Sequence, residues 1–420
     1  MKVLNFLFLY PLYIDPGTGS ALFSILIGAA ATIYFLGRAL IIKLKVVISG
    51  GKVSKSTGLE NPYVIYNEGR QYSNVFKPVL DEFEARNVNI IYLSSDKNDP
   101  LLYESHNFVK KEFIGEENKA FLRLNMLKAD VVLMTTPGLD VYQLKRSKGV
   151  KHYAHILHAP SDAVMYRLFG IDYFDSILLT GDYQEKDIRT LETMRGLPQK
   201  RLMTVGCTYL DVASEKVKLI PKENNPPFTV LISPSWGPSA LLSRYGAKLL
   251  DPLVKTGWRV IVRPHPQSKK SENKMIETLT EHYKDAVNLE WDFESENIYS
   301  LSKSNIMISD FSGIIYDYMF LFDKPVMYVL QRFDMRPYDA DDLGENVMEE
   351  LWQFKTLRET GVELKEEHFN SIAETIQKVT GSKRLEAARL EAKKTAWAYQ
   401  GESGKRVVNF MMDIVNTCSG

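Results

Sequence analysis

Short apolar runs alternate with amphipathic segments along most of the chain, and this rhythm constrains the fold more than any other feature. Residues 63–66 (YVIY) and 89–93 (NIIYL) are typical of buried strands, and residues 74–87 between them carry apolar side chains at helical spacing. Strands that alternate with helices form parallel sheets covered by helices on both faces. The sequence therefore predicts an α/β fold.

The alternation of predicted strands and helices occurs in two successive series along the chain. In the first series we expect further strands at 131–134, 152–157 and 176–179, and helices at 119–128 and 182–194. In the second we expect strands at 229–232, 259–262, 287–289, 306–308 and 326–329, and helices at 241–254, 274–283, 297–301 and 312–321. The chain is thus predicted to contain two doubly wound sheets, which commonly hold a ligand at the carboxyl ends of their strands.

A charged, proline-rich stretch at 215–227 separates the two series and marks the expected domain boundary. We assign residues 46–215 to an N-terminal Rossmann-like acceptor domain and residues 226–385 to a C-terminal Rossmann-like donor-binding domain. Residues 386–420 are expected to form a helical segment that packs back. A chain of 420 residues is longer than one hydrophobic core usually organises, in agreement with two domains.

The N-terminal 45 residues form a predicted membrane anchor. Residues 21–42 are apolar except for Arg38 and are long enough as a helix to cross a hydrocarbon core of about 30 Å. The lysines that follow favour a cytoplasmic side for the rest of the chain. A cleaved signal peptide and a buried soluble helix are the competing interpretations, and whether residues 3–14 span, re-enter or lie on the membrane stays open. We therefore expect localisation at the cell membrane, with the domains facing the cytoplasm.

Composition excludes several other classes of protein. Lys+Arg and Asp+Glu both number 52, so the chain lacks the net positive charge with which proteins grip nucleic acid. The cysteines are only Cys207 and Cys418, too few for a disulfide framework. We expect no nucleic-acid partner and a reducing compartment.

Residues 305–313 (NIMISDFSG) combine a buried strand with the start of a helix. Unpaired backbone N–H groups and the positive dipole end of a helix suit phosphate oxygens, so Ser309, Asp310, Ser312 and Gly313 are predicted donor-binding residues. The alternative is that these residues only cap the helix. Ser235, in the small-residue loop after the strand at 229–232, is a further predicted donor-binding residue, although a plain turn explains it equally well.

Residues 259–266 (RVIVRPHP) place a cation and an imidazole at a strand end. Prolines on both sides restrict the backbone around His265, and Arg263 and His265 could stabilise a diphosphate or protonate a leaving oxygen. The alternative is that Arg263 and His265 are loop residues kept only for solubility. We expect Arg263 to bind the donor and His265 to act in catalysis.

Histidines at 152, 155 and 158 recur every third residue, which suggests a metal site. Side chains alternate between the faces of a strand, so the three cannot converge on one ion, and we expect no metal and no cofactor. His158 follows the strand and faces the expected cleft, where it could act as a general base on a hydroxyl.

Several motifs in this order resemble the CDP-glycerol glycerophosphotransferase family of teichoic acid synthesis. They are 157–160 (LHAP), 171–175 (IDYFD), 263–266 (RPHP), 309–313 (SDFSG), 316–318 (YDY) and 324–328 (KPVMY). The resemblance covers residues 60–385 and departs at Ala159, where the family has glycine, and at 206–211 (GCTYLD), which lacks a Pro-Arg pair.

The resemblance implies a GT-B fold of two Rossmann-like domains and a metal-independent transferase. It implies transfer of glycerol phosphate, or a related polyol phosphate, from a CDP-alcohol to a hydroxyl of a lipid-linked polyol phosphate or glycan acceptor, with release of CMP. His158 would then be the base and His265 would stabilise the diphosphate or the departing CMP from the opposite wall of the cleft. A nucleotide-sugar glycosyltransferase or epimerase of the same fold, or an inactive envelope scaffold, remains the alternative.

Overall fold

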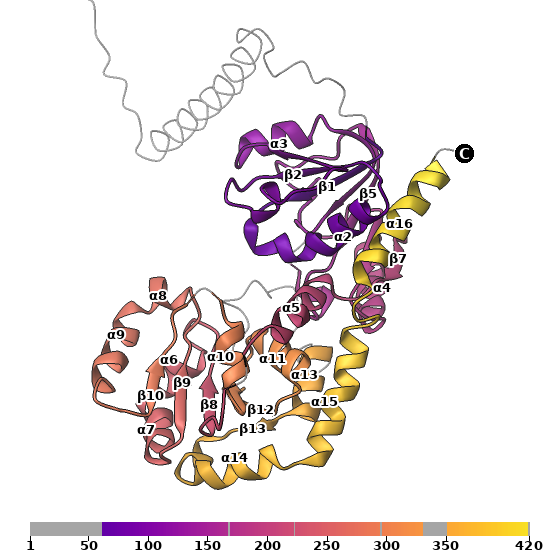
Figure 1. Cartoon of the computed structure of the whole chain (residues 1–420). Helices are drawn as coiled ribbons and strands as arrows, with labels where there is room; N and C mark the ends of the chain where they lie inside the picture. Colours follow the sequence, from indigo (N-terminus) through magenta and orange to yellow (C-terminus); the bar gives the residue numbers. More distant parts are fainter. Residues whose placement is uncertain (1–60, 167–168, 222, 295, 331–350, 419–420) are drawn as a thin grey trace, which may run out of the picture. The chain divides into compact units, whose positions relative to one another are not determined.

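The computed structural model describes residues 61–330 and 351–418, apart from residues 167, 168, 222 and 295. Its ribbon is drawn in Figure 1. The predicted membrane helix at 21–42 lies outside the described residues. Among the helices of the described part, none is both long and apolar enough to cross a bilayer.

Within the described residues, the N-terminal sheet has seven parallel strands in the spatial order β3-β2-β1-β4-β5-β6-β7. In chain order these are β1 (Tyr63–Asn67), β2 (Ile90–Ser94), β3 (Val109–Phe113), β4 (Lys128–Met134), β5 (Gly149–Ile156), β6 (Ser176–Leu179) and β7 (Arg201–Thr204). The main helices of this half are α2 (Ser73–Ala85), α3 (Asn118–Leu124), α4 (Tyr183–Arg195) and α5 (Thr208–Lys218), with short 3-10 turns η1 (Arg70–Tyr72), η2 (Pro100–Leu102) and η3 (Ala163–Met165). The strand order reverses direction between β1 and β4.

The C-terminal sheet repeats this order with six described parallel strands, β10-β9-β8-β11-β12-β13. They are β8 (Thr229–Ile232), β9 (Arg259–Val262), β10 (Leu289–Trp291), β11 (Ile306–Ser309), β12 (Val326–Tyr328) and β13 (Val362–Glu363). The helices are α6 (Leu241–Tyr245), α7 (Ala247–Lys255), α8 (Ser268–Ser271), α9 (Asn273–His282), α10 (Ile298–Lys303), α11 (Ile314–Phe322), α13 (Trp352–Thr360), η5 (Glu366–Ser371), α14 (Ile372–Thr380), α15 (Lys383–Ala396) and α16 (Ser403–Cys418). The prediction of two parallel-sheet α/β domains is confirmed.

Apolar strands and helix faces build a separate core in each half. Val230, Ile261 and Ile308 come from central strands of the C-terminal sheet and are at most 1% exposed. In the N-terminal half, Ile65 of β1 and Val79 of α2 belong to one buried cluster. The central strands carry apolar side chains on both faces because helices cover both sides of each sheet.

Some predicted elements differ from the structure. The helix expected at 241–254 is broken into α6 and α7 at Gly246, whose φ of 42° lies in the left-handed region that favours glycine. The strand expected at 287–289 is shifted to β10, and Val287 is fully exposed. The helix expected at 119–128 ends at Leu124, because β4 already begins at Lys128, where it pairs with Gly149 of β5. The spacing of apolar residues within this segment carries no information about the pairing of β4 with β5.

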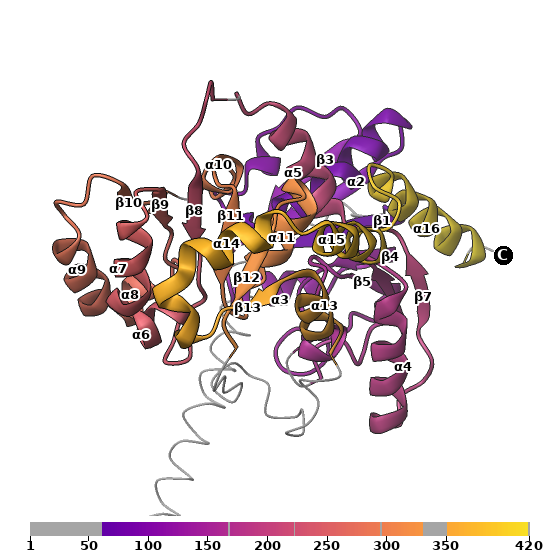
Figure 2. The same ribbon diagram turned by 90° about the horizontal axis from the view of Figure 1, so that it is seen from below.

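The C-terminal segment forms two helices. α15 and α16 are separated by residues 397–402, where Gly401 has a φ of 78°. Helix α16 packs against α2 of the N-terminal half, and both views show them side by side (Figures 1 and 2). Asp211 of α5 holds the junction, because its carboxylate accepts hydrogen bonds from Trp397 Nε1 at 2.7 Å and from the Gly401 N–H at 2.8 Å.

Candidate active site

A cavity of about 450 Å³ opens at the carboxyl ends of strands from both sheets. Tyr72, just after β1, and His158, just after β5, line it from the N-terminal half. Asp310, just after β11, and Asp317 of α11 line it from the C-terminal half. These strand ends lie at or next to the positions where the strand order reverses, which is where open α/β sheets bind ligands. The cavity is therefore the candidate active site.

His158 is held by its Nδ1 atom. That nitrogen lies 3.0 Å from Thr135 Oγ1 and 3.3 Å from the Tyr166 hydroxyl, and the imidazole packs edge-on to the Tyr72 ring. Burial lowers the pKa of His158 to about 4, so the ring is neutral at pH 7. When Nδ1–H donates to Thr135 Oγ1, Nε2 carries the lone pair and is the basic nitrogen. The geometry can therefore supply a neutral base.

His155 lies behind this site and is completely buried. Its ring packs edge-on to Tyr166 and Phe174, with ring centroids 5.2 and 4.9 Å apart, and neither ring nitrogen has a hydrogen-bond partner in the structure. Burial, with a smaller contribution from His158, lowers the pKa of His155 to about 3. His152 instead contacts Ser176 Oγ through Nε2 at 2.7 Å. The three histidines thus have three different environments.

Asp310 organises the C-terminal wall of the cavity. Its Oδ1 accepts the backbone N–H of Ser235 at 2.9 Å and of Ser312 at 3.2 Å, and its Oδ2 accepts that of Leu241 at 2.9 Å. The side chain is fully buried, and burial raises its pKa to about 6 against the lowering effect of these bonds. The carboxylate therefore braces the loops after β8 and β11. It does not point a free negative charge at a ligand.

Gly313 lines the cavity at the start of α11. A Cβ placed there would meet no atom within 4 Å, so there is open space beside this helix terminus. Gly313 is the N-cap residue and has no side chain to cap the helix, so the start of α11 borders a region with room for an anion. Of the predicted donor-binding residues, Asp310 and Gly313 line the cavity, and Ser312 lies between them.

Ser309, Ser235 and Arg263 lie outside the cavity lining. The Ser309 hydroxyl is fully buried and donates to the Ser233 carbonyl at 2.6 Å. Arg263 Nη1 contacts Asp292 Oδ2 at 2.5 Å, and its Nη2 donates to the Glu294 carbonyl at 2.6 Å. In this structure the guanidinium is held by the carboxylate that follows β10, and the role of Arg263 in donor binding stays a prediction.

His265 also lies outside the cavity lining. It is half-buried, its Nδ1 accepts the Gln267 N–H at 3.1 Å, and its ring lies 6.5 Å from that of Trp236. Burial lowers the pKa of His265, and Glu272 opposes that shift. The ring of Trp236 lies near His265, and the neighbouring Ser235 N–H donates to Asp310. Of the two predicted catalytic histidines, His158 lines the cavity and His265 does not.

Sequence reasoning missed the Asp317–Tyr209 pair. The Tyr209 hydroxyl donates to Asp317 Oδ2 at 3.1 Å, and both residues line the cavity. Burial raises the pKa of Asp317 to about 7, so the carboxyl is close to half protonated at neutral pH. Asp317 follows Gly313 by four residues and therefore shares its helix face, which is the signal that could have identified it.

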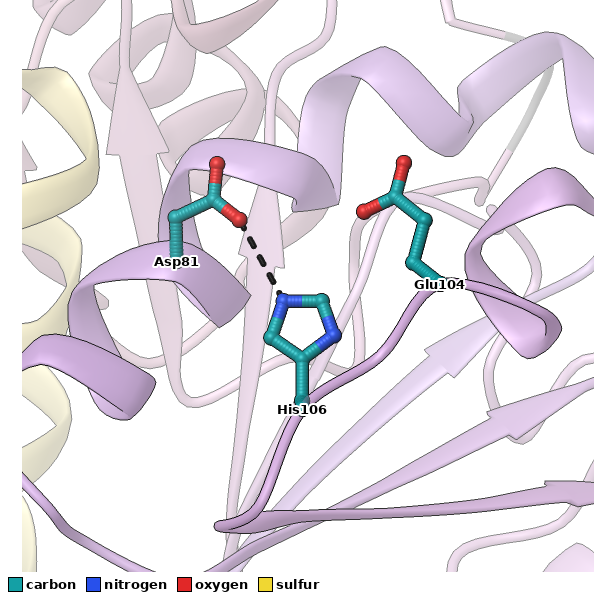
Figure 3. A group of neighbouring side chains, drawn as sticks. All are labelled: Asp81, Glu104 and His106. Atoms are coloured by element: carbon teal, nitrogen blue, oxygen red, sulfur yellow. Dashed lines mark hydrogen bonds and ion pairs between the residues drawn. The ribbon is translucent and has the colours of Figure 1, made fainter.

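Asp81, Glu104 and His106 form the one grouping of possible metal ligands among the described residues (Figure 3). Figure 3 shows His106 Nε2 against Asp81 Oδ1, at 3.3 Å. Lys77 Nζ lies 3.2 Å from the Asp81 carboxylate and 3.0 Å from Glu104, and Lys111 Nζ lies 2.7 Å from His106 Nδ1. The two lysines already balance the carboxylates, so this group is an ion-pair network that joins α2 to β3.

The fold and this cavity define a two-domain α/β protein of the GT-B type. Residues 229–412 match the sequence model of the CDP-glycerol:poly(glycerophosphate) glycerophosphotransferase family. The C-terminal half of the chain therefore resembles this family, and the resemblance noted from the sequence motifs is confirmed. No curated protein sequence matches the chain significantly.

Solved structures share the fold. One structure of the wall teichoic acid polymerase TagF has a TM-score of 0.54 at 14% identity, over 85% of this chain and 90% of that chain. A TagF variant soaked with CDPG has a TM-score of 0.56 at 12% identity, over 91% and 98% of the two chains. The UDP-GlcNAc 2-epimerase from Neisseria meningitidis has a TM-score of 0.52 at 14% identity, over 84% and 100%. At these identities the similarity establishes the fold alone.

Proposed function

We propose that this protein transfers glycerol phosphate from CDP-glycerol to a hydroxyl of a lipid-linked cell-envelope acceptor and releases CMP. The observation that carries the proposal is the placement of the neutral His158 in the same cavity as the open start of α11. A base and an anion site are the two elements that such a transfer requires. The match of residues 229–412 to the glycerophosphotransferase family model supports glycerol phosphate as the group transferred.

The diphosphate of the donor lies at the N-terminus of α11, beside Gly313 and Ser312. Backbone N–H groups and the helix dipole stabilise its charge there. Asp310 contributes indirectly, because it fixes the loops that shape this end of the cavity. His265 approaches the leaving CMP from the neighbouring loop once the donor is bound, and Arg263 keeps that loop in place through Asp292.

In the reaction, the acceptor hydroxyl attacks the phosphorus that carries the glycerol. A bond forms between the acceptor oxygen and this phosphorus, and the bond from the phosphorus to the oxygen bridging it to CMP breaks. CMP leaves with the electron pair, and His158 Nε2 takes the proton of the acceptor hydroxyl. Phosphoryl-type transfer depends mainly on positioning and charge stabilisation, which this cavity supplies with protein groups.

We further propose that residues 21–42 anchor the protein to the cell membrane, with both domains on the cytoplasmic side. The length and low charge of this segment support an anchor, and the lysines after it support the orientation. An anchor would keep the cavity near an acceptor that is itself lipid-linked. Primer-type and polymer-type acceptors are both compatible with the proposal.

A panel of donors tests the proposal. Purified full-length protein in detergent is incubated with CDP-glycerol, CDP-ribitol and UDP-GlcNAc, with a lipid-linked acceptor present, and the nucleotide released is identified by chromatography. We expect CMP release with CDP-glycerol that requires the acceptor. UDP release, or conversion of UDP-GlcNAc without an acceptor, would support the alternative of a nucleotide-sugar transferase or epimerase. No turnover of any donor would support an envelope scaffold.

A further inference from the structure

The loop that carries His158 reaches into the C-terminal half through one buried carboxylate. Asp162 lies four residues after His158 and is 1% exposed. Its Oδ1 accepts the backbone N–H of Trp352 at 2.7 Å, and its Oδ2 accepts that of Gln353 at 2.9 Å. Both N–H groups belong to the first turn of α13, so Asp162 caps a helix that lies about 190 residues further along the chain.

Helix α13 receives no side-chain cap from its own N-cap residue, Leu351, which offers no acceptor. Asp162 instead pairs the first N–H groups of the helix, those of Trp352 and Gln353. A carboxylate at a helix N-terminus is also favoured by the helix dipole. The carboxylate therefore pairs the first N–H groups of α13, and α13 in turn holds the carboxylate in place. Asp162 belongs to the N-terminal half of the molecule, whereas α13 belongs to the C-terminal half.

Side-chain packing surrounds this bond. The rings of Tyr183 and Trp352 lie 4.2 Å apart, and the Tyr316 hydroxyl donates to the Gln353 carbonyl at 2.5 Å. Val164 and Met165 of the His158 loop pack against Leu351 and Phe354. The contact thus combines apolar packing with one carboxylate that accepts two hydrogen bonds.

The contact also forms a wall of the active-site cavity. Met165 lines the cavity from the His158 loop, and Gln353 and Phe354 line it from α13. A shift of α13 away from Asp162 would therefore change the space between His158 and the start of α11.

We propose that Asp162 is a positioning residue that docks the His158 loop on α13 and so sets the distance between the base and the donor. The inference rests on the proposed function, because it assigns Asp162 a role in the same cavity. Asp162 itself touches no reacting group. Its effect on the reaction passes through the position of His158.

The test uses three variants of the full-length protein. Asp162→Ala removes both acceptors, and Asp162→Asn keeps one oxygen but turns an amide N–H toward the second backbone N–H. Asp187→Asn is the matched control: Asp187 of α4 accepts the Ala163 N–H at 2.8 Å and so holds the same loop from within the N-terminal half. For each, transfer kinetics with CDP-glycerol and the equilibrium Kd of the donor are measured.

We expect kcat to fall about thirtyfold in Asp162→Ala and less in Asp162→Asn, with the donor Kd within about twofold of the wild type, because the loss is one of orientation. Asp187→Asn should keep kcat within about threefold. Equal kcat values for Asp162→Ala and wild type would overturn the inference, as would a loss confined to the donor Kd.

A second readout does not depend on activity. Protein labelled with 5-fluorotryptophan has five fluorine resonances in its NMR spectrum, and Trp352→Phe identifies the one from Trp352. Asp162→Ala and Asp162→Asn should shift or broaden the Trp352 resonance and leave the other four in place, which also shows that the variants are folded. An unmoved Trp352 resonance would overturn the docking itself. If the wild type transfers nothing from CDP-glycerol, the proposed function fails, while this spectrum still decides whether Asp162 docks the loop.

Discussion

Two loops line the cavity from opposite halves, and they are braced in opposite ways. The loop after β11 is held from within its own half, because Asp310 accepts three backbone N–H groups of the C-terminal half. The loop after β5 is held in part from the other half, through Asp162 and the first turn of α13. The bracing of the β11 loop does not depend on the contact between the two halves, whereas the bracing of the β5 loop requires that contact.

This difference suggests that the two loops have separate roles. A site braced within one half is formed before any ligand arrives, which suits the binding of a donor. A base braced by the other half is in position only when the contact is made, which suits a step that must wait for both substrates.

His158→Ala should abolish most of the transfer. Loss of a general base typically costs about 10²–10⁴-fold, so we expect kcat to fall about 10³-fold with the donor Kd nearly unchanged. Steady-state kinetics and calorimetric binding of CDP-glycerol separate the two quantities. Tyr103→Phe, on the exposed surface, is a suitable control. A loss of donor affinity equal to the loss of kcat would place His158 in the donor site instead.

Asp310→Ala should destabilise the C-terminal half. The substitution leaves three backbone N–H groups without their partner, and we expect a loss of about 3 kcal/mol in the free energy of unfolding, together with weaker donor binding. Denaturation in urea measures the first effect. Asp310→Asn keeps one acceptor oxygen and should lie between the wild type and the alanine variant. An alanine variant of wild-type stability would show that Asp310 does not brace the loops.

His265→Ala should affect the donor more than the chemical step. The side chain lies outside the cavity lining, so we expect the donor Kd to rise about tenfold while kcat changes less. The measurement is again kinetics combined with equilibrium binding. A loss of kcat as large as that of His158→Ala, with the donor Kd unchanged, would show that His265 acts in the chemical step and not mainly in donor binding.

Asp317 should make stability depend on pH. Its pKa is raised from 3.8 to about 7 in the folded protein, so its contribution is fully present below pH 3.8 and is lost as the pH rises through about 7. Relative to Asp317→Asn, the wild type should therefore lose about 1 kcal/mol of unfolding free energy between about pH 5 and about pH 7, a value reduced for solvent at the cavity wall. Urea titrations at several pH values test this. A difference between the two proteins that stays constant with pH would contradict the raised pKa.

The sequence allowed the centre of each sheet to be predicted but not its edges. The central strands are buried on both faces, so β1, β2, β8 and β11 are continuous apolar runs. The edge strand β3 (VKKEF) buries only Val109, and the edge strand β7 (RLMT) has no fully buried residue. Edge strands face solvent and carry charges, so their apolar pattern is too weak to be recognised before the neighbouring strand is known.

The same difference between central and edge strands applies to the candidate site. His158, Asp310 and Gly313 could be predicted because each follows a recognisable central strand, and strand ends in parallel sheets carry ligand-binding residues. Arg263 has the same position after β9, but its partner Asp292 follows the edge strand β10 and could not be paired with it from spacing alone. The contact of Asp162 with α13 spans about 190 residues and has no local signature.

A single-turnover experiment shows whether His158 acts on the acceptor hydroxyl after the donor has bound. The protein, in excess over CDP-glycerol labelled in its glycerol, is mixed with a lipid-linked acceptor and sampled for labelled lipid and CMP. We predict that the wild type forms both in equal amounts, and that His158→Ala binds the donor as tightly but forms neither. Labelled lipid at the wild-type rate from His158→Ala, or CMP without labelled lipid from the wild type, would contradict the account.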